Sequence, residues 1–169
     1  TDHDLLREFS KTFGKSLQRL ERYYYGLSYT GESTPKMRDL ISSYGERFSA
    51  ELLTCAMNAR GVKSVCRMPQ NIGMITDGKY EDATADLEVT RANFREHLSP
   101  ILDEGTLVFV PGFYGISEDG NITTYGRGGT DYSAAVATVA MGAEVLEFWK
   151  DVAGFMTADP RMVPDAELI

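Results

Sequence analysis

The chain has 169 residues and is 43% hydrophobic, which is enough to build one sizeable core. Its 25 acidic and 17 basic residues give a formal charge of −8, which disfavours a general attraction to nucleic acid or to anionic membranes. We therefore expect a single domain that has no nucleic-acid or membrane partner. An anionic substrate would need positive charge placed locally.

The sequence also bears on the compartment. No apolar stretch approaches the roughly 20 residues that a membrane span requires, and the N-terminus lacks the layout of a signal peptide. Cys55 and Cys66 have no further Cys or paired His nearby, which fits neither a zinc site nor a disulfide framework. Unpaired thiols are typical of a reducing compartment. We expect a soluble, cytoplasmic protein without a metal site built from clustered side chains.

The first third of the chain is predicted to be helical. Apolar residues recur at helical spacing through residues 4–25, which indicates an amphipathic helix. Thr34 and Pro35 form a capping residue followed by a proline suited to the first helical turn, so a second helix is expected to begin there. We expect this second helix to be interrupted or kinked near Gly45, and to end near Gly61.

The rest of the chain alternates short strands and helices. The expected elements are strands at 62–67 and 72–76, a helix at 86–98, a buried strand at 106–110, a hairpin turning at 117–121, a helix at 130–141 and a strand at 144–149. This order predicts an α/β fold with a mainly parallel sheet flanked by helices. Three aromatic residues in these elements are expected in the core rather than as base-stacking platforms: Tyr132, Phe148 and Trp149.

A glycine-rich run opens the last predicted helix. Backbone N–H groups near Gly128, Gly129 and Thr130 would point at an anion, with the helix dipole behind them. A Gly-Gly pair before a helix is also common as a plain tight turn. No Gly-Lys-Ser or Gly-Lys-Thr follows, so the run is not a P-loop.

Charged residues beside this run suggest a ligand with both signs of charge. Arg127 could grip a carboxylate or phosphate with two hydrogen bonds, and Asp131 could accept from an ammonium. The plain alternative is an ion pair between Arg127 and Asp131. Glu46 is either a further ligand contact or a solvated carboxylate at a helix start.

A second set of charged residues follows the last predicted strand. Asp151 comes where ligand sites of open parallel sheets gather, outside the carboxyl ends of the strands. Asp159 and Arg161 lie on a loop that contains a proline. They form either a turn with an ion pair or part of a nucleotide site.

Taken together and in order, these segments resemble the aspartokinases of the amino acid kinase family. The segments are 43–50 (SYGERFSA), 112–115 (GFYG), 123–134 (TTYGRGGTDYSA) and 149–161 (WKDVAGFMTADPR). The resemblance implies that Glu46, Arg127 and Asp131 contact aspartate, that Asp131 is a catalytic candidate, and that the backbone of Gly128, Gly129 and Thr130 faces the reacting phosphoryl group. It assigns ATP contacts to a final group: Lys150, Asp151, Met156 and Arg161. Thr130, Lys150 and Met156 depart from the commoner Ser, Thr and Tyr.

The resemblance also implies an activity. It is the phosphorylation of the side-chain carboxylate of L-aspartate to 4-phospho-L-aspartate, with ATP and Mg²⁺, in the first step of lysine, threonine and methionine biosynthesis. An ionised carboxylate, with an ordinary pKa of about 3.9, needs no general base. A homo-oligomer is expected for the full-length protein.

The same resemblance implies an incomplete domain. Residues 1–169 would be a partial catalytic domain of an amino acid kinase-like fold, incomplete at both ends, with an aspartate-binding region at about 40–135 and a nucleotide-binding region at about 140–169. The family's Lys-Phe-Gly-Gly loop does not occur here, so the chain by itself is expected to be inactive. Two alternatives stay open: another amino acid kinase, such as a glutamate or acetylglutamate kinase, and a non-catalytic binding or assembly fragment of the same fold.

Overall fold

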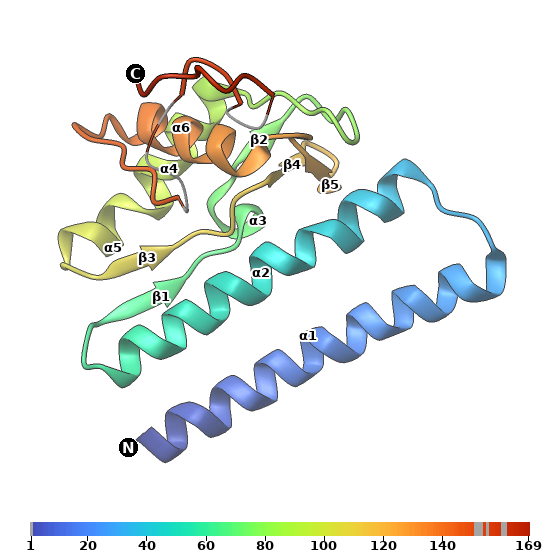
Figure 1. Ribbon diagram of the computed structural model, residues 1–169. Helices are drawn as coiled ribbons and strands as arrows, with labels where there is room; N and C mark the ends of the chain where they lie inside the picture. Colours follow the sequence, from blue (N-terminus) through green and yellow to red (C-terminus); the bar gives the residue numbers. More distant parts are fainter. Residues whose placement is uncertain (1, 151–153, 155, 160–161) are drawn as a thin grey trace.

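A computed structural model describes residues 2–150, 154, 156–159 and 162–169. A long helical hairpin, α1 (Asp2–Thr30) and α2 (Pro35–Ala59), lies along one side of a mixed α/β body (Figure 1). Thr34 caps α2 as predicted, because its Oγ1 accepts a hydrogen bond from the Met37 N–H at 3.3 Å.

The predicted interruption of α2 is wrong. Gly45 lies within one continuous helix of 25 residues. A glycine inside a helix costs about 1 kcal/mol relative to alanine, and the packing of α2 outweighs this cost. The Phe13 ring of α1 lies 4.6 Å from the Phe48 ring of α2, and α2 also contacts β1, β3 and β5. The predicted end is confirmed, since α2 stops at Ala59 and Gly61 follows with φ +80°.

The strands form two small sheets. In one, β1 (Ser64–Cys66) pairs in parallel with β3 (Leu107–Phe109). In the other, β2 (Ile75–Thr76) is parallel to β4 (Tyr114–Ser117), which forms a hairpin with β5 (Ile122–Thr124). The predicted α/β class, the parallel pairing and the hairpin are confirmed.

The remaining helices cover this body. They are α3 (Pro69–Ile72), α4 (Leu87–His97), α5 (Ser99–Asp103) and α6 (Gly129–Met141). Asp86 caps α4, because its Oδ1 accepts hydrogen bonds from the Glu88 and Val89 N–H groups. The main core cluster lies where α4 packs on α6 and includes Ile72, Met74, Phe94, Tyr125 and Val136. The body therefore fixes the start of α6 against the end of the β4–β5 hairpin.

Two predictions about the C-terminal part are wrong. Residues 145–150 form neither strand nor helix, because no strand in the described part of the chain pairs with them and an unpaired strand leaves its backbone groups unsatisfied. Trp149 is 91% exposed, and Phe148 and Tyr132 also lie at the surface rather than in the core. Without a strand to hold it, the 145–150 segment leaves Trp149 almost fully exposed.

Two smaller findings complete the fold. Among the described helices, none has the length and apolarity needed to cross a membrane. Cys55 and Cys66 are both free thiols, and burial raises the pKa of Cys66 from its usual 9.0 to about 11.

Candidate active site at the start of α6

The glycine-rich run forms a tight turn between β5 and α6. Gly126 and Gly128 both have positive φ, +71° and +76°, and Gly128 precedes the first helical residue of α6. A Cβ on Gly126 would lie 2.6 Å from the backbone oxygen of Glu81. Backbone conformation and close approach therefore both require glycine at position 126. The predicted helix start at residue 130 is correct to within one residue.

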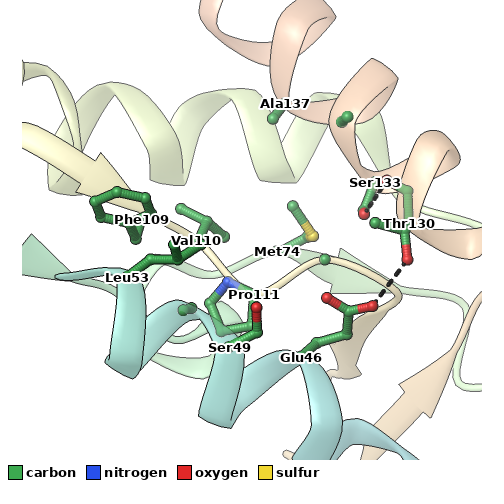
Figure 2. Close-up of a pocket in the computed structure, with 13 residues that line it drawn as sticks. Glu46, Ser49, Leu53, Met74, Phe109, Val110, Pro111, Thr130, Ser133 and Ala137 are labelled. Carbon is green, nitrogen blue, oxygen red and sulfur yellow. Dashed lines mark hydrogen bonds between the residues drawn. The ribbon is translucent and has the colours of Figure 1, made fainter. Parts of the chain in front are cut away.

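Glu46 reaches this turn from the middle of α2. Its Oε1 accepts a hydrogen bond from the Thr130 Oγ1 at 3.1 Å, which joins α2 to the first turn of α6 (Figure 2). The predicted pairing of these two segments around one site is consistent with this contact. The other Glu46 oxygen has no hydrogen bond within the described part of the chain, so the carboxylate can still accept from a ligand.

Glu46 and Thr130 line one part of a cavity of about 220 Å³. The cavity lies between α2, the segment that connects β3 to β4, and α6 (Figure 2). Most of its lining is apolar and includes Leu53, Met74 and Val110. Three of its polar side chains, Glu46, Thr130 and Ser133, lie together on one side, while Ser49 lies beside Pro111 (Figure 2). A polar ligand would therefore bind at that side, with apolar walls behind it.

The segment before β4 is held in a strained conformation. Phe113 has φ +73°, a left-handed conformation that costs a bulky residue about 1–2 kcal/mol. Its N–H donates to the Ser133 Oγ at 3.0 Å, and its carbonyl accepts from the Tyr125 N–H at 3.0 Å. The Ser133 Oγ in turn donates to the Thr130 carbonyl at 2.8 Å. Strain of this kind is concentrated at functional sites.

Asp131 forms an ion pair, but not with the expected partner. The Lys150 Nζ lies 2.8 Å and 2.6 Å from the two carboxylate oxygens of Asp131, and both side chains are about half exposed. The alternative of an Arg127–Asp131 pair is wrong. Arg127 is exposed and makes no hydrogen bond or ion pair with any residue that the structure describes. Its guanidinium is thus free to bind an anion beside the start of α6.

The predicted nucleotide contacts are only partly visible. Asp151 and Arg161 lie outside the described residues. Met156 forms an isolated antiparallel bridge with Leu168, and Lys150 is the residue already paired with Asp131. Within the described ranges there is no group of three or more His, Cys, Asp or Glu that could hold a metal ion.

Sequence reasoning missed Phe113, Ser133 and Asp39. Phe113 lies between the two glycines of the 112–115 segment, and Ser133 ends the glycine-rich run, so both are close to residues that the sequence assigned to the site. Asp39 had no such signal, because only the structure shows that it shares the buried face of α2 with Ser43, where an acidic residue needs a specific partner.

The fold and this turn define the class of protein. The sequence pattern of the amino acid kinase family matches residues 4–169, and the chain belongs to that family. Within it, the chain is similar to aspartokinases. It is 39% identical to the aspartokinase of Thermus thermophilus over 128 residues, and 34% identical to the aspartate kinase of Pseudomonas fluorescens over 164 residues. These alignments cover 76% and 97% of this chain, and 30% and 38% of the relatives.

A solved structure gives the same result. The fold resembles that of Escherichia coli aspartokinase III in complex with aspartate and ADP, with a TM-score of 0.86 and 30% identity. The match covers 94% of this chain and 35% of that protein. The resemblance to aspartokinases and the amino acid kinase-like fold are therefore confirmed, and the chain spans about a third of the length of these relatives.

Proposed function

We propose that residues 1–169 are part of an aspartokinase catalytic domain, with the aspartate-binding region at about 40–135 and the nucleotide-binding region at about 140–169. The full-length protein would transfer a phosphoryl group from ATP to the side-chain carboxylate of L-aspartate, forming 4-phospho-L-aspartate and ADP. The observation that carries this proposal is the convergence of Glu46, the free Arg127 and the start of α6 on one polar turn. The similarity to aspartokinases, one of them solved with aspartate and ADP, supports it.

The charges of this turn complement a free amino acid. Arg127 would hold the α-carboxylate with paired hydrogen bonds, since no described residue occupies its guanidinium. Glu46 is the better acceptor for the α-ammonium, because only one of its oxygens is engaged whereas Asp131 already pairs with Lys150. The backbone of Gly128, Gly129 and Thr130 would then face the side-chain carboxylate and the transferred phosphoryl group.

The chemistry needs no base from the protein. A carboxylate with a pKa near 3.9 is ionised at neutral pH, so one of its oxygens can attack directly while the bond to the departing ADP oxygen breaks. The residues present would therefore act by alignment and by neutralising charge. Asp131 would contribute by orienting the Lys150 ammonium toward the phosphoryl oxygens.

ATP would supply the phosphoryl group, with Mg²⁺ neutralising part of its charge. Lys150 would also neutralise phosphate charge, because its ammonium is half exposed beside the start of α6. Asp151, Met156 and Arg161 stay predicted nucleotide contacts. Mg²⁺ is commonly held by phosphates and one or two carboxylates rather than by a protein cage, so the described residues are compatible with it.

The wider context stays a prediction. We expect the full-length protein to be a cytoplasmic homo-oligomer that serves lysine, threonine and methionine biosynthesis, and we expect residues 1–169 to be inactive by themselves.

An ADP-release assay with three acceptor conditions tests the function. Protein that contains this chain within a complete kinase domain is assayed with aspartate, with glutamate and without an acceptor. Turnover with aspartate, but not with glutamate or without an acceptor, supports the proposal. Turnover with glutamate would favour another amino acid kinase, and no turnover by correctly folded protein would favour a binding or assembly role.

A further inference from the structure

The carboxylate of Asp39 is buried and fully engaged. The residue is 1% exposed and lies on α2, two helical turns before Glu46. Its Oδ2 accepts from the Glu81 N–H at 2.9 Å and from the Thr124 N–H at 3.0 Å, and its Oδ1 accepts from the Thr124 Oγ1 at 2.8 Å. A buried carboxylate is costly unless hydrogen bonds of this kind compensate it.

The two partners of Asp39 lie directly at the glycine-rich turn. Thr124 is the last residue of β5 and immediately precedes the turn. Glu81 has φ +65°, and its backbone oxygen is the atom that a side chain on Gly126 would strike. Asp39 therefore fixes both the strand that enters the turn and the loop that packs against it.

The far end of the turn is tied to the same helix. Glu46 of α2 accepts from Thr130, the second residue of α6. Asp39 and Glu46 are seven residues apart, so they lie on nearly the same face of α2, separated by about 10 Å along its axis. Since α2 is continuous, it holds the turn at both ends with two carboxylates at a fixed spacing.

We propose that Asp39 is a positioning residue for the amino-acid site. It sets the place of the 125–128 turn relative to Glu46, and thereby the distance between Glu46 and the Arg127 backbone. Asp39 touches no reacting atom itself. The inference rests on the proposed function, in which Arg127 and Glu46 bind opposite ends of the amino acid.

A matched pair of variants on α2 tests this inference. Asp39→Ala releases the glycine-rich turn. Asn58→Ala removes a side chain that holds the backbone of a different segment, because the Asn58 Oδ1 accepts from the Ser64 N–H at 3.0 Å and its Nδ2 donates to the Ser64 carbonyl at 2.8 Å. Both variants lose a comparable structural contact, and only the first loses a contact with the proposed site.

The first readout is steady-state kinetics in the full-length protein. Because small misplacements of binding groups are costly, Asp39→Ala should raise the KM for aspartate by about tenfold or more, with less than about a twofold change in the KM for ATP. Asn58→Ala should change neither KM. Equal increases in both KM values for Asp39→Ala, or the same aspartate effect in Asn58→Ala, would overturn the inference.

The second readout is amide hydrogen exchange, which does not depend on activity and is measured over residues 1–169 within the full-length protein. Asp39→Ala should lower protection at Glu81 and through 124–130 but not in β1, whereas Asn58→Ala should do the reverse. Loss of protection spread evenly over the chain would contradict a positioning role. If aspartate is not a substrate but the exchange pattern holds, the proposed function fails while the structural role of Asp39 stands.

A milder variant keeps the test decisive if Asp39→Ala does not fold. Thr124→Val removes only the hydroxyl that donates a hydrogen bond to Asp39, and it preserves the shape of the side chain. It should raise the KM for aspartate in the same direction but less. An unchanged KM for aspartate in folded Thr124→Val, together with unaltered exchange at 124–130, would count against the inference.

Discussion

Arg127→Ala should separate substrate binding from stability. Arg127 is exposed and has no hydrogen-bond or ion-pair partner among the described residues, so its removal should change the free energy of unfolding by less than about 0.5 kcal/mol. A hydrogen bond to a charged group contributes about 1.5–3 kcal/mol when its partner is bound. Because about 1.4 kcal/mol corresponds to a tenfold change in affinity, we expect the KM for aspartate to rise roughly 10- to 150-fold.

The assay is coupled ADP release by the full-length protein, with aspartate and ATP varied separately. Arg91→Ala is the matched control, because Arg91 is an exposed arginine on α4 that has no proposed role. The KM for ATP should change little in either variant. If Arg127→Ala raises the two KM values equally, or lowers the unfolding midpoint markedly, the assignment of Arg127 to the amino-acid carboxylate is refuted.

Three further predictions concern the turn, a half-buried acid and the ion pair. Gly126→Ala should lower the free energy of unfolding by about 2–4 kcal/mol in urea denaturation, because the new side chain adds left-handed strain and a 2.6 Å contact with the Glu81 backbone oxygen. The control Gly120→Ala, where φ is +76° and the space is open, should cost only about 1–2 kcal/mol. Equal losses in the two variants would contradict the close approach at Gly126. Burial raises the pKa of Glu51 in the folded state, and its Oε2 is buried without a hydrogen-bond partner among the described residues. The protonated form is therefore the one that the fold favours. The stability that Glu51 contributes is fully present below its unfolded pKa and is lost as the pH rises through its folded pKa. Glu51→Gln should therefore raise the unfolding free energy at pH 7 but not at pH 4, and the same gain at both values would disprove this cause. Lys150→Met should change the free energy of unfolding by less than about 1 kcal/mol, because exposed ion pairs contribute little. In steady-state kinetics it should raise the KM for ATP more than the KM for aspartate. A larger effect on the KM for aspartate would assign Lys150 to the amino-acid site instead.

Local signals in the sequence predicted the elements well. The Thr34-Pro35 cap, the turn residues of the β4–β5 hairpin and the end of the last helix at Met141 depend on nearby backbone groups, and the structure has all three. The start of α6 was predictable for the same reason. These features depend on a few neighbouring residues, which a sequence displays directly.

Features that depend on distant packing were predicted less well. Gly45 looked like a break because its local propensity is poor, but contacts of α2 with α1 and the body keep the helix continuous. The segment at 144–149 was predicted to be a strand, but no described strand pairs with it. Lys150 as the partner of Asp131 could not be read from the sequence either, because an exposed ion pair across 19 positions leaves no local pattern.

The continuity of α2 through Gly45 has a consequence for how the proposed site tolerates thermal motion. A hinge at Gly45 would let the Asp39 and Glu46 halves of the helix fluctuate independently, and the spacing between the two anchors would vary. In one unbroken helix, tilting or sliding moves both anchors together and leaves the distance between them unchanged. The glycine-rich turn then moves together with α2, and its internal geometry is preserved while the helix as a whole moves.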